Sequence, residues 1–158
     1  MLILFDAFFG ALLAAVAFPL PGGLQAKPTI HERLASLKTL KCTFPTMATG
    51  TWTKGAAEGA LKPAKLSVGF DSIDTDDGTA RVIGDFGPSE IIVRLASGTL
   101  HFLQSFRDGP LYVTTVFPKE TKPGWLQAAH TRHEYTEVIL PGFTSRPEQY
   151  YGECEVGQ

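Results

Sequence analysis

Alternating apolar and polar positions dominate the chain from about residue 40 to its end. This period of two is typical of strands that bury one face and expose the other. A further, more polar strand is predicted from about Ala128 to Leu140. The apolar positions fall into seven runs: Leu40, Cys42, Phe44; Leu66, Val68, Phe70; Ala80, Val82, Gly84, Phe86; Ile91, Val93, Leu95; Leu100, Phe102, Gln104, Phe106; Leu111, Val113, Thr115, Phe117; and Tyr150, Gly152, Cys154, Val156.

Tight turns separate these runs. Asp76-Asp77-Gly78 and Ser97-Gly98 are typical of short β-hairpins, and Arg107-Asp108-Gly109-Pro110 makes a slightly longer turn. Parallel pairing would need crossover helices, for which residues 65–117 leave no room. The sequence therefore predicts a mainly β fold: a single antiparallel up-and-down meander of about eight strands, closed or nearly closed into a small barrel. A curved sheet covered by a helix is the alternative.

One short helix is predicted near the amino terminus, from about Ile30 to Leu37. Thr29 and Glu32 have the spacing of a capping box, and the apolar stripe of this segment would dock on a sheet edge or a barrel end. Two other stretches do not alternate. Residues 45–63 are rich in Gly and Ala and predict a strand around Thr49 to Thr53 followed by a mobile loop, and residues 119–124 predict a solvated loop.

Residues 1–26 predict an export signal. An apolar run from Ala7 to Phe18 is followed by the helix-breaking segment 19–23, and a cleavage site is expected after Ala26. No positive charge precedes the run, and an anchor formed by residues 1–20 is the alternative. Asp6 and the short length of the run, below the ~20 apolar residues that a membrane span needs, favour the cleaved signal. Residues 27–158 then form a single β domain in a secreted or periplasmic protein.

Cys42 and Cys154 are the only cysteines of the chain. In an exported protein a disulfide between them is expected, and both lie on the apolar phase of their strands. The bond would join the first and last strands of the domain.

The charge balance limits the class of partner. Fourteen Lys and Arg against 16 Asp and Glu give a formal net charge of −2, without a concentrated basic region. We therefore expect no nucleic-acid partner and no attachment to a membrane surface after signal cleavage.

No pattern in the chain predicts catalytic residues, a metal site or a cofactor. His130, His133 and Glu134 match neither order of the zinc hydrolase motifs, and in a strand the two histidines would face opposite sides. The aspartates before Gly78 do not match an EF-hand loop. No Gly-x-Ser-x-Gly elbow occurs, and the disulfide would consume both cysteines.

Binding candidates come from polar residues expected at the barrel interior. Gln104 interrupts an apolar phase, so its amide is either hydrogen-bonded in the core or directed at a ligand. In the strand that follows Ala128, Arg132 and Glu134 share one face, whereas His133 and Tyr135 share the other. The sequence leaves open which of these faces is the inner one.

Gly50-Thr51-Trp52 resembles the Gly-x-Trp that opens the first barrel strand of lipocalins and, more loosely, of avidin-like proteins. The resemblance covers three residues and supports a barrel; no ligand is transferred from it. Trp52 joins Gln104, Arg132, His133, Glu134 and Tyr135 as a candidate ligand-binding residue.

Together these features predict an exported, non-enzymatic module that binds an unknown small molecule or a protein partner. The run from Leu140 to Tyr151 is rich in aromatic residues and Pro; the interpretation it favours is a Pro-braced loop packed over the barrel end, and an anchor for a protein partner is the alternative. The alternative is an extracytoplasmic hydrolase whose carboxylate and histidine site is assembled by the fold.

Overall fold

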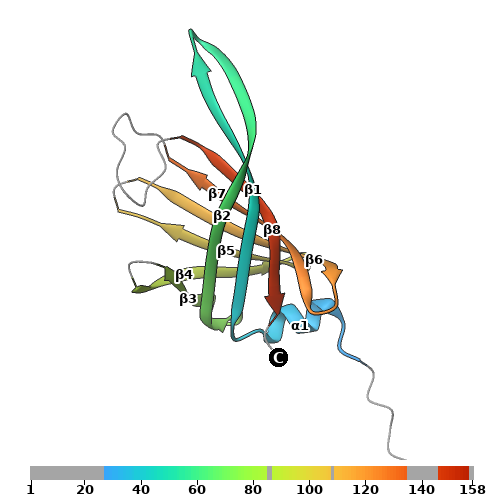
Figure 1. The fold of residues 1–158 in the computed structure, drawn as a ribbon. Helices are drawn as coiled ribbons and strands as arrows, with labels where there is room; N and C mark the ends of the chain where they lie inside the picture. The colour runs from blue at the N-terminus through green and yellow to red at the C-terminus, as the bar shows by residue number, and fades with distance from the viewer. Residues whose placement is uncertain (1–26, 85–86, 108, 135–145, 157–158) are drawn as a thin grey trace, which may run out of the picture.

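The chain folds into a closed ring of eight antiparallel strands with one short helix (Figure 1). The computed structural model describes residues 27–84, 87–107, 109–134 and 146–156. Each strand pairs with the next along the chain, and the last strand pairs with the first, so the expected mainly β meander is confirmed. The elements are α1 (Ile30–Ser36), β1 (Leu40–Thr53), β2 (Ala56–Asp74), β3 (Thr79–Gly84), β4 (Gly87–Ala96), β5 (Thr99–Ser105), β6 (Leu111–Lys122), β7 (Trp125–His133) and β8 (Glu148–Val156).

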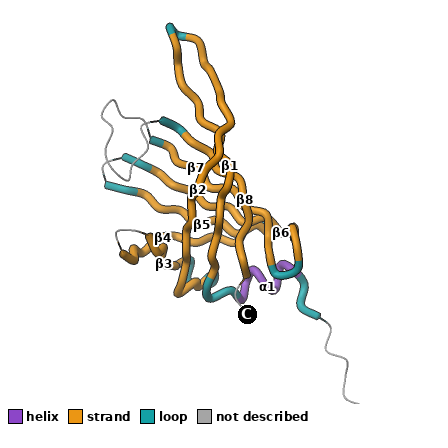
Figure 2. The backbone as a smooth tube through the Cα atoms, viewed as in Figure 1, coloured by secondary structure: helices purple, strands orange, loops and turns teal. Residues whose placement is uncertain are grey.

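The helix α1 is set by its capping box. The Thr29 hydroxyl accepts a hydrogen bond from the Glu32 amide, and the Glu32 carboxylate accepts one from the Thr29 amide, at 3.2 and 2.7 Å. Leu34 and Leu37 are buried against the barrel. The helix lies at the barrel end opposite the long hairpin (Figure 2), as expected for a helix with one apolar stripe.

Aromatic and aliphatic side chains fill the barrel between this helix and the opposite mouth. The rings of Phe70 and Phe102 stack with centroids 4.0 Å apart, and Phe44 and Val93 are fully buried nearby. The inward phases predicted for β1, β2, β4 and β5 are thereby confirmed. In β3 the predicted Ala80 and Val82 are buried, whereas Gly84 is exposed and Phe86 lies outside the described residues.

The inward phase predicted for β6 is wrong. Its buried positions are Tyr112, Thr114 and Val116, whereas Phe117 is 39% exposed. Directly paired residues share a face of a sheet, and Phe102 of β5 pairs with Thr114. Because Phe102 points inward, Thr114 must do so as well, and the strand register overrides the greater hydrophobicity of Leu111 and Val113.

The segment between the bodies of β6 and β7, expected to be a loop, is mostly strand. β6 continues to Lys122 and turns only at Pro123-Gly124, where Gly124 has a φ of 80°, so most of the loop predicted at residues 119–124 is absent. β7 then begins at Trp125, earlier than the predicted Ala128, and Tyr135 to Leu140 lie outside the described residues.

β1 and β2 extend past the ring as a projecting two-stranded ribbon (Figure 1). The mobile loop predicted within residues 45–63 is therefore wrong. Lys54 and Gly55 both have positive φ, 49° and 84°, which is the geometry of a two-residue type I′ hairpin turn. Trp52 lies near the tip and is 60% exposed, so Gly50-Thr51-Trp52 ends the first strand instead of opening it.

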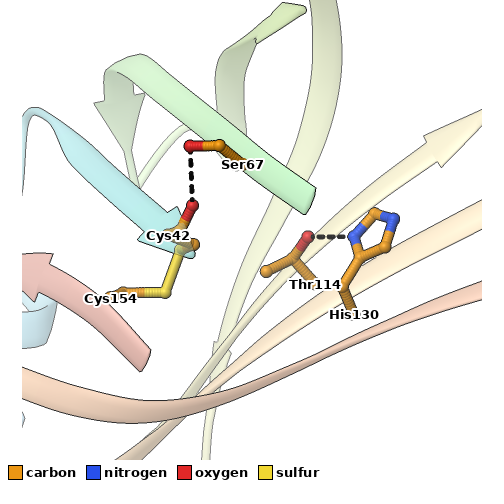
Figure 3. The surroundings of a disulfide bond; sticks show 5 residues. All are labelled: Cys42, Ser67, Thr114, His130 and Cys154. Atoms are coloured by element: carbon orange, nitrogen blue, oxygen red, sulfur yellow. Dashed lines mark hydrogen bonds between the residues drawn. A yellow bond between two sulfur atoms is a disulfide. The ribbon is translucent and has the colours of Figure 1, made fainter. Parts of the chain in front are cut away.

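The Cys42–Cys154 disulfide joins β1 to β8 (Figure 3). The two residues are direct cross-strand partners with Cα atoms 3.9 Å apart, and both side chains are fully buried. The bond links positions 112 residues apart and lies where the barrel closes. Residues 1–26 lie outside the described part of the chain, and the described residues contain no helix long and apolar enough to cross a membrane.

Gly152 is needed where β8 passes the bulge of β1. A Cβ atom at this position would overlap the Thr43 carbonyl oxygen and lie 2.8 Å from the Phe44 Cα, both of them backbone atoms that cannot rotate away. We expect Gly152→Ala to lower the free energy of unfolding by about 3 kcal/mol, the upper part of the range for overpacking. Urea denaturation monitored by circular dichroism measures this.

Gly84→Ala is the matched control, because a Cβ atom there meets nothing within 4 Å. We expect its effect to stay within about 0.5 kcal/mol. Equal stabilities of the two variants would contradict the close approach of β8 to β1.

Candidate functional site

Polar and aromatic side chains gather inside the barrel at the mouth from which the hairpin projects. They come from β5, β6, β7 and β8, whose register places them in two rows of cross-strand neighbours. The outer row is Gln104, Tyr112, Arg132 and Glu148, and the row below it is Phe102, Thr114, His130 and Tyr150.

His130 is the buried centre of this group. Its Nδ1 lies 2.8 Å from the Thr114 hydroxyl (Figure 3), and its Nε2 accepts a hydrogen bond from Arg132 Nε at 3.4 Å. Because an arginine can only donate, Nε2 is the unprotonated nitrogen, and the Nδ1 proton is donated to Thr114. Burial, together with the charge of Arg132, lowers the pKa of His130 to about 3, so the imidazole is neutral at physiological pH.

The guanidinium of Arg132 lies over two aromatic rings. Its central carbon is 4.9 Å from the ring centroid of Tyr112 and 5.5 Å from that of Tyr150. Among the ion pairs formed between described residues, none involves Arg132. Stacking and the bond to His130 therefore hold the group in place, and its two terminal nitrogens donate no hydrogen bond to another described residue.

Two glutamates near Arg132 accept hydrogen bonds from the tyrosines. The Tyr112 hydroxyl donates to Glu134 Oε1 at 3.0 Å, and the Tyr150 hydroxyl donates to Glu148. Burial and the neighbouring Glu134 raise the pKa of Tyr112 to about 12, and burial with the bond to Glu148 raises the pKa of Tyr150. Both phenols thus remain protonated donors over the physiological range.

A cavity of about 190 Å³ opens at this mouth. The side formed by β2 and β3 is mainly apolar, with Val68 and Val82 among its members, and β6 and β7, which lie across the ring, carry the polar groups. Gln104 is part of the lining, and its side-chain amide forms no hydrogen bond to another described residue. The described lining consists of Leu66, Ser67, Val68, Val82, Ile83, Gly84, Gly87, Ser89, Gln104, Phe106, Tyr112, His130 and Arg132.

Below the cavity the barrel is nearly solid. The void beneath Gln104 and His130, bounded by Phe70 and Phe102, measures about 10 Å³, which is at the lower limit for one water molecule. Any ligand is therefore confined to the mouth and cannot thread through the barrel.

The structure brings together some of the candidate residues and separates others. Gln104 and Arg132 line the cavity, and Glu134 reaches the same cluster through Tyr112. His133 is exposed on the opposite face of β7, Trp52 lies near the hairpin tip, and Tyr135 falls outside the described residues. The face of β7 that carries Arg132 is therefore the inner one.

Several members of the cluster were not expected from the sequence as binding residues, among them Tyr112, Tyr150 and His130. His130 and Arg132 are two residues apart, so in a strand they lie on the same face. This spacing could have identified His130 from the sequence. Tyr112 was missed because it lies on the phase of β6 that was assigned to the outside, and its contact with Arg132 depends on the pairing of β6 with β7.

This cluster is better suited to binding a ligand than to transferring a proton. A histidine with a pKa of about 3 is a poor general base at neutral pH, and Thr114 beside it is only 2% exposed. Over the described part of the chain, no three His, Cys, Asp or Glu residues are grouped so as to hold a metal ion.

Fold and site together define a closed, disulfide-linked antiparallel barrel with a small cavity at one mouth and a fixed arginine on its polar wall. Comparisons of the chain with protein-family models, with curated proteins and with solved structures find no match.

Proposed function

We propose that this protein binds a compact organic anion in the cavity at the barrel mouth, as a non-enzymatic module outside the cytoplasm. Arg132 carries the proposal: it is the single charged side chain in the described lining, because His130 is neutral. Tyr112 and Tyr150 hold its guanidinium in place before any ligand arrives, which reduces the entropy lost on binding.

The lining determines the kind of molecule expected. A carboxylate or similar anionic group would accept hydrogen bonds from the terminal nitrogens of Arg132 and from the Gln104 amide. The apolar part of the ligand would contact Val68 and Val82 on the opposite wall. The cavity volume of about 190 Å³ is the volume that roughly six molecules occupy in liquid water, so the ligand is small.

Location outside the cytoplasm is proposed on two grounds. The Cys42–Cys154 bond is of a kind that persists in oxidising compartments, and residues 1–26 have the composition of an export signal.

Native mass spectrometry of the protein recovered from its own host tests the proposal. We expect a small adduct that is released on denaturation and is detected as an anion. An adduct that binds equally well to Arg132→Gln would show that the molecule is held somewhere else.

The affinity for that molecule should depend on the two polar wall residues in a graded way. We expect Gln104→Ala to weaken binding about tenfold, because one hydrogen bond is lost. Arg132→Gln should weaken it by about 10- to 100-fold, because a charge-assisted bond is lost. Isothermal titration calorimetry measures both values.

His101→Ala is the control on the same strand as Gln104. Its ring lies on the outer face, where Nδ1 is 3.1 Å from the Thr115 hydroxyl. We expect unchanged affinity and a loss of stability below about 1 kcal/mol. Weaker binding in this variant would place the ligand outside the barrel.

A further inference from the structure

The ribbon formed by β1 and β2 beyond the ring has a long strand edge without a partner among the described residues. β3 pairs with β2 only from Gly69 to Asp74, so residues 56–62 have β1 on one side and no described strand on the other. Residues 57–63 are all exposed. An edge of this length is a template for pairing with another chain, and proteins normally protect it.

The hydrogen bonds of β1 show which backbone groups this edge presents. The Gly50 amide donates to the Pro147 carbonyl, on the β8 side of the strand, so Gly50 and its partner Gly59 do not bond to each other. In an antiparallel ladder, the backbone groups of such a pair point away from each other. The regular register then directs the backbone groups of Ala57, Gly59 and Leu61, and the carbonyl of Pro63, outward. We call these four residues the hairpin edge.

The charges on either side of the hairpin edge are self-complementary. Glu58 and Lys62 lie on the same face of β2, two residues before and two residues after Ala60. In a two-fold antiparallel pairing centred on Ala60, Glu58 of each chain lies opposite Lys62 of the other. This register also places Gly59 opposite Leu61, both of which have outward backbone groups, so the hydrogen-bond pattern and the charge pattern agree.

The opposite face of the ribbon has a place for a side chain of the second copy. Gly50 and Gly59 lie side by side, and a Cβ atom at Gly50 would meet nothing within 4 Å. In the same register, Leu61, which is 75% exposed, would lie over Gly50 and Gly59 of the other chain, where no side chain occupies the surface.

The length of the free edge also fits this register. The turn at Lys54 and Gly55 of one chain would lie opposite residues 65–66 of the other, before Gly69, where β3 occupies the edge. The projection of the ribbon from the barrel leaves room for the approach (Figure 1).

We propose that two copies of this chain associate through their hairpin edges, in antiparallel register about Ala60. The contact extends the ribbon into a four-stranded sheet and is small for a protein interface, so the dimer is expected to be concentration-dependent.

Sedimentation velocity of the oxidised protein over a wide concentration range tests the proposal. We expect the average mass to rise toward twice that of the chain. Glu58→Lys and Lys62→Glu should each weaken association about tenfold, because like charges then lie opposite each other at two symmetric positions. Both side chains are exposed, so circular dichroism should show the barrel unchanged.

The combined variants test the register itself. The double variant E58K/K62E should associate as tightly as the original chain, and an equimolar mixture of the two single variants should form mixed dimers. A monomer at every concentration, or single variants that associate normally, would overturn the proposal. Binding of the monomeric protein to anionic lipid vesicles, detected by co-sedimentation, would show instead that the exposed ribbon face contacts membranes.

Discussion

Reduction of the Cys42–Cys154 bond is expected to lower the free energy of unfolding by about 4 to 5 kcal/mol. The bond closes a loop of 112 residues, and in the chain-entropy model a loop of that order restricts the unfolded chain by this amount. Most domains are stable by only about 5–15 kcal/mol, so the reduced protein should be close to unfolding. Urea denaturation of the oxidised and the reduced protein measures the difference.

Reduced wild-type protein is a better comparison than a Cys→Ala variant, because both sulfur atoms are fully buried and truncation would add a packing loss. Intact mass after alkylation without reductant should show no free thiol in protein purified from its own host. Identical unfolding curves before and after reduction would contradict the role of the bond in closing the barrel.

Acid is expected to destabilise the barrel through His130. Its pKa is about 3 in the folded chain and near 6.5 when unperturbed, so the unfolded chain binds the proton more readily. The stabilisation is complete above pH 6.5 and is lost as the pH falls from 6.5 toward 3. The full loss is on the order of 5 kcal/mol, from 1.36 kcal/mol per pKa unit.

His130→Gln separates this effect from that of the surface carboxylates. A glutamine can accept from Arg132 and donate to Thr114, but it does not titrate in this range. Denaturation curves recorded across the acid range should show the wild type losing stability relative to the variant. A constant difference between the two proteins would mean that His130 is not buried in its neutral form.

The architecture could be predicted largely because its signals are local. The capping box of Thr29 and Glu32 and the turn at Ser97-Gly98 each specify backbone geometry within a few residues. The alternation of β1 and β8 placed Cys42 and Cys154 on inner faces without knowledge of the pairing.

The site was harder to predict because it depends on the register between strands. Gln104 and Arg132 could be proposed individually, but Tyr112 was assigned to the outside because Leu111 and Val113 made the other phase of β6 more apolar. The projecting ribbon was missed for a related reason: its Ala and Gly residues have low strand propensity, and its pairing across Lys54-Gly55 determines the structure.

Electron density in the mouth cavity, from crystals of the protein purified from its own host, tests the central claim most directly. We predict a compact molecule between the apolar wall at Val68 and Val82 and the polar wall, with its anionic group within hydrogen-bond distance of the Arg132 terminal nitrogens. A cavity that contains only water, or one in which Arg132 is paired with an acid of its own chain, would contradict the proposed function.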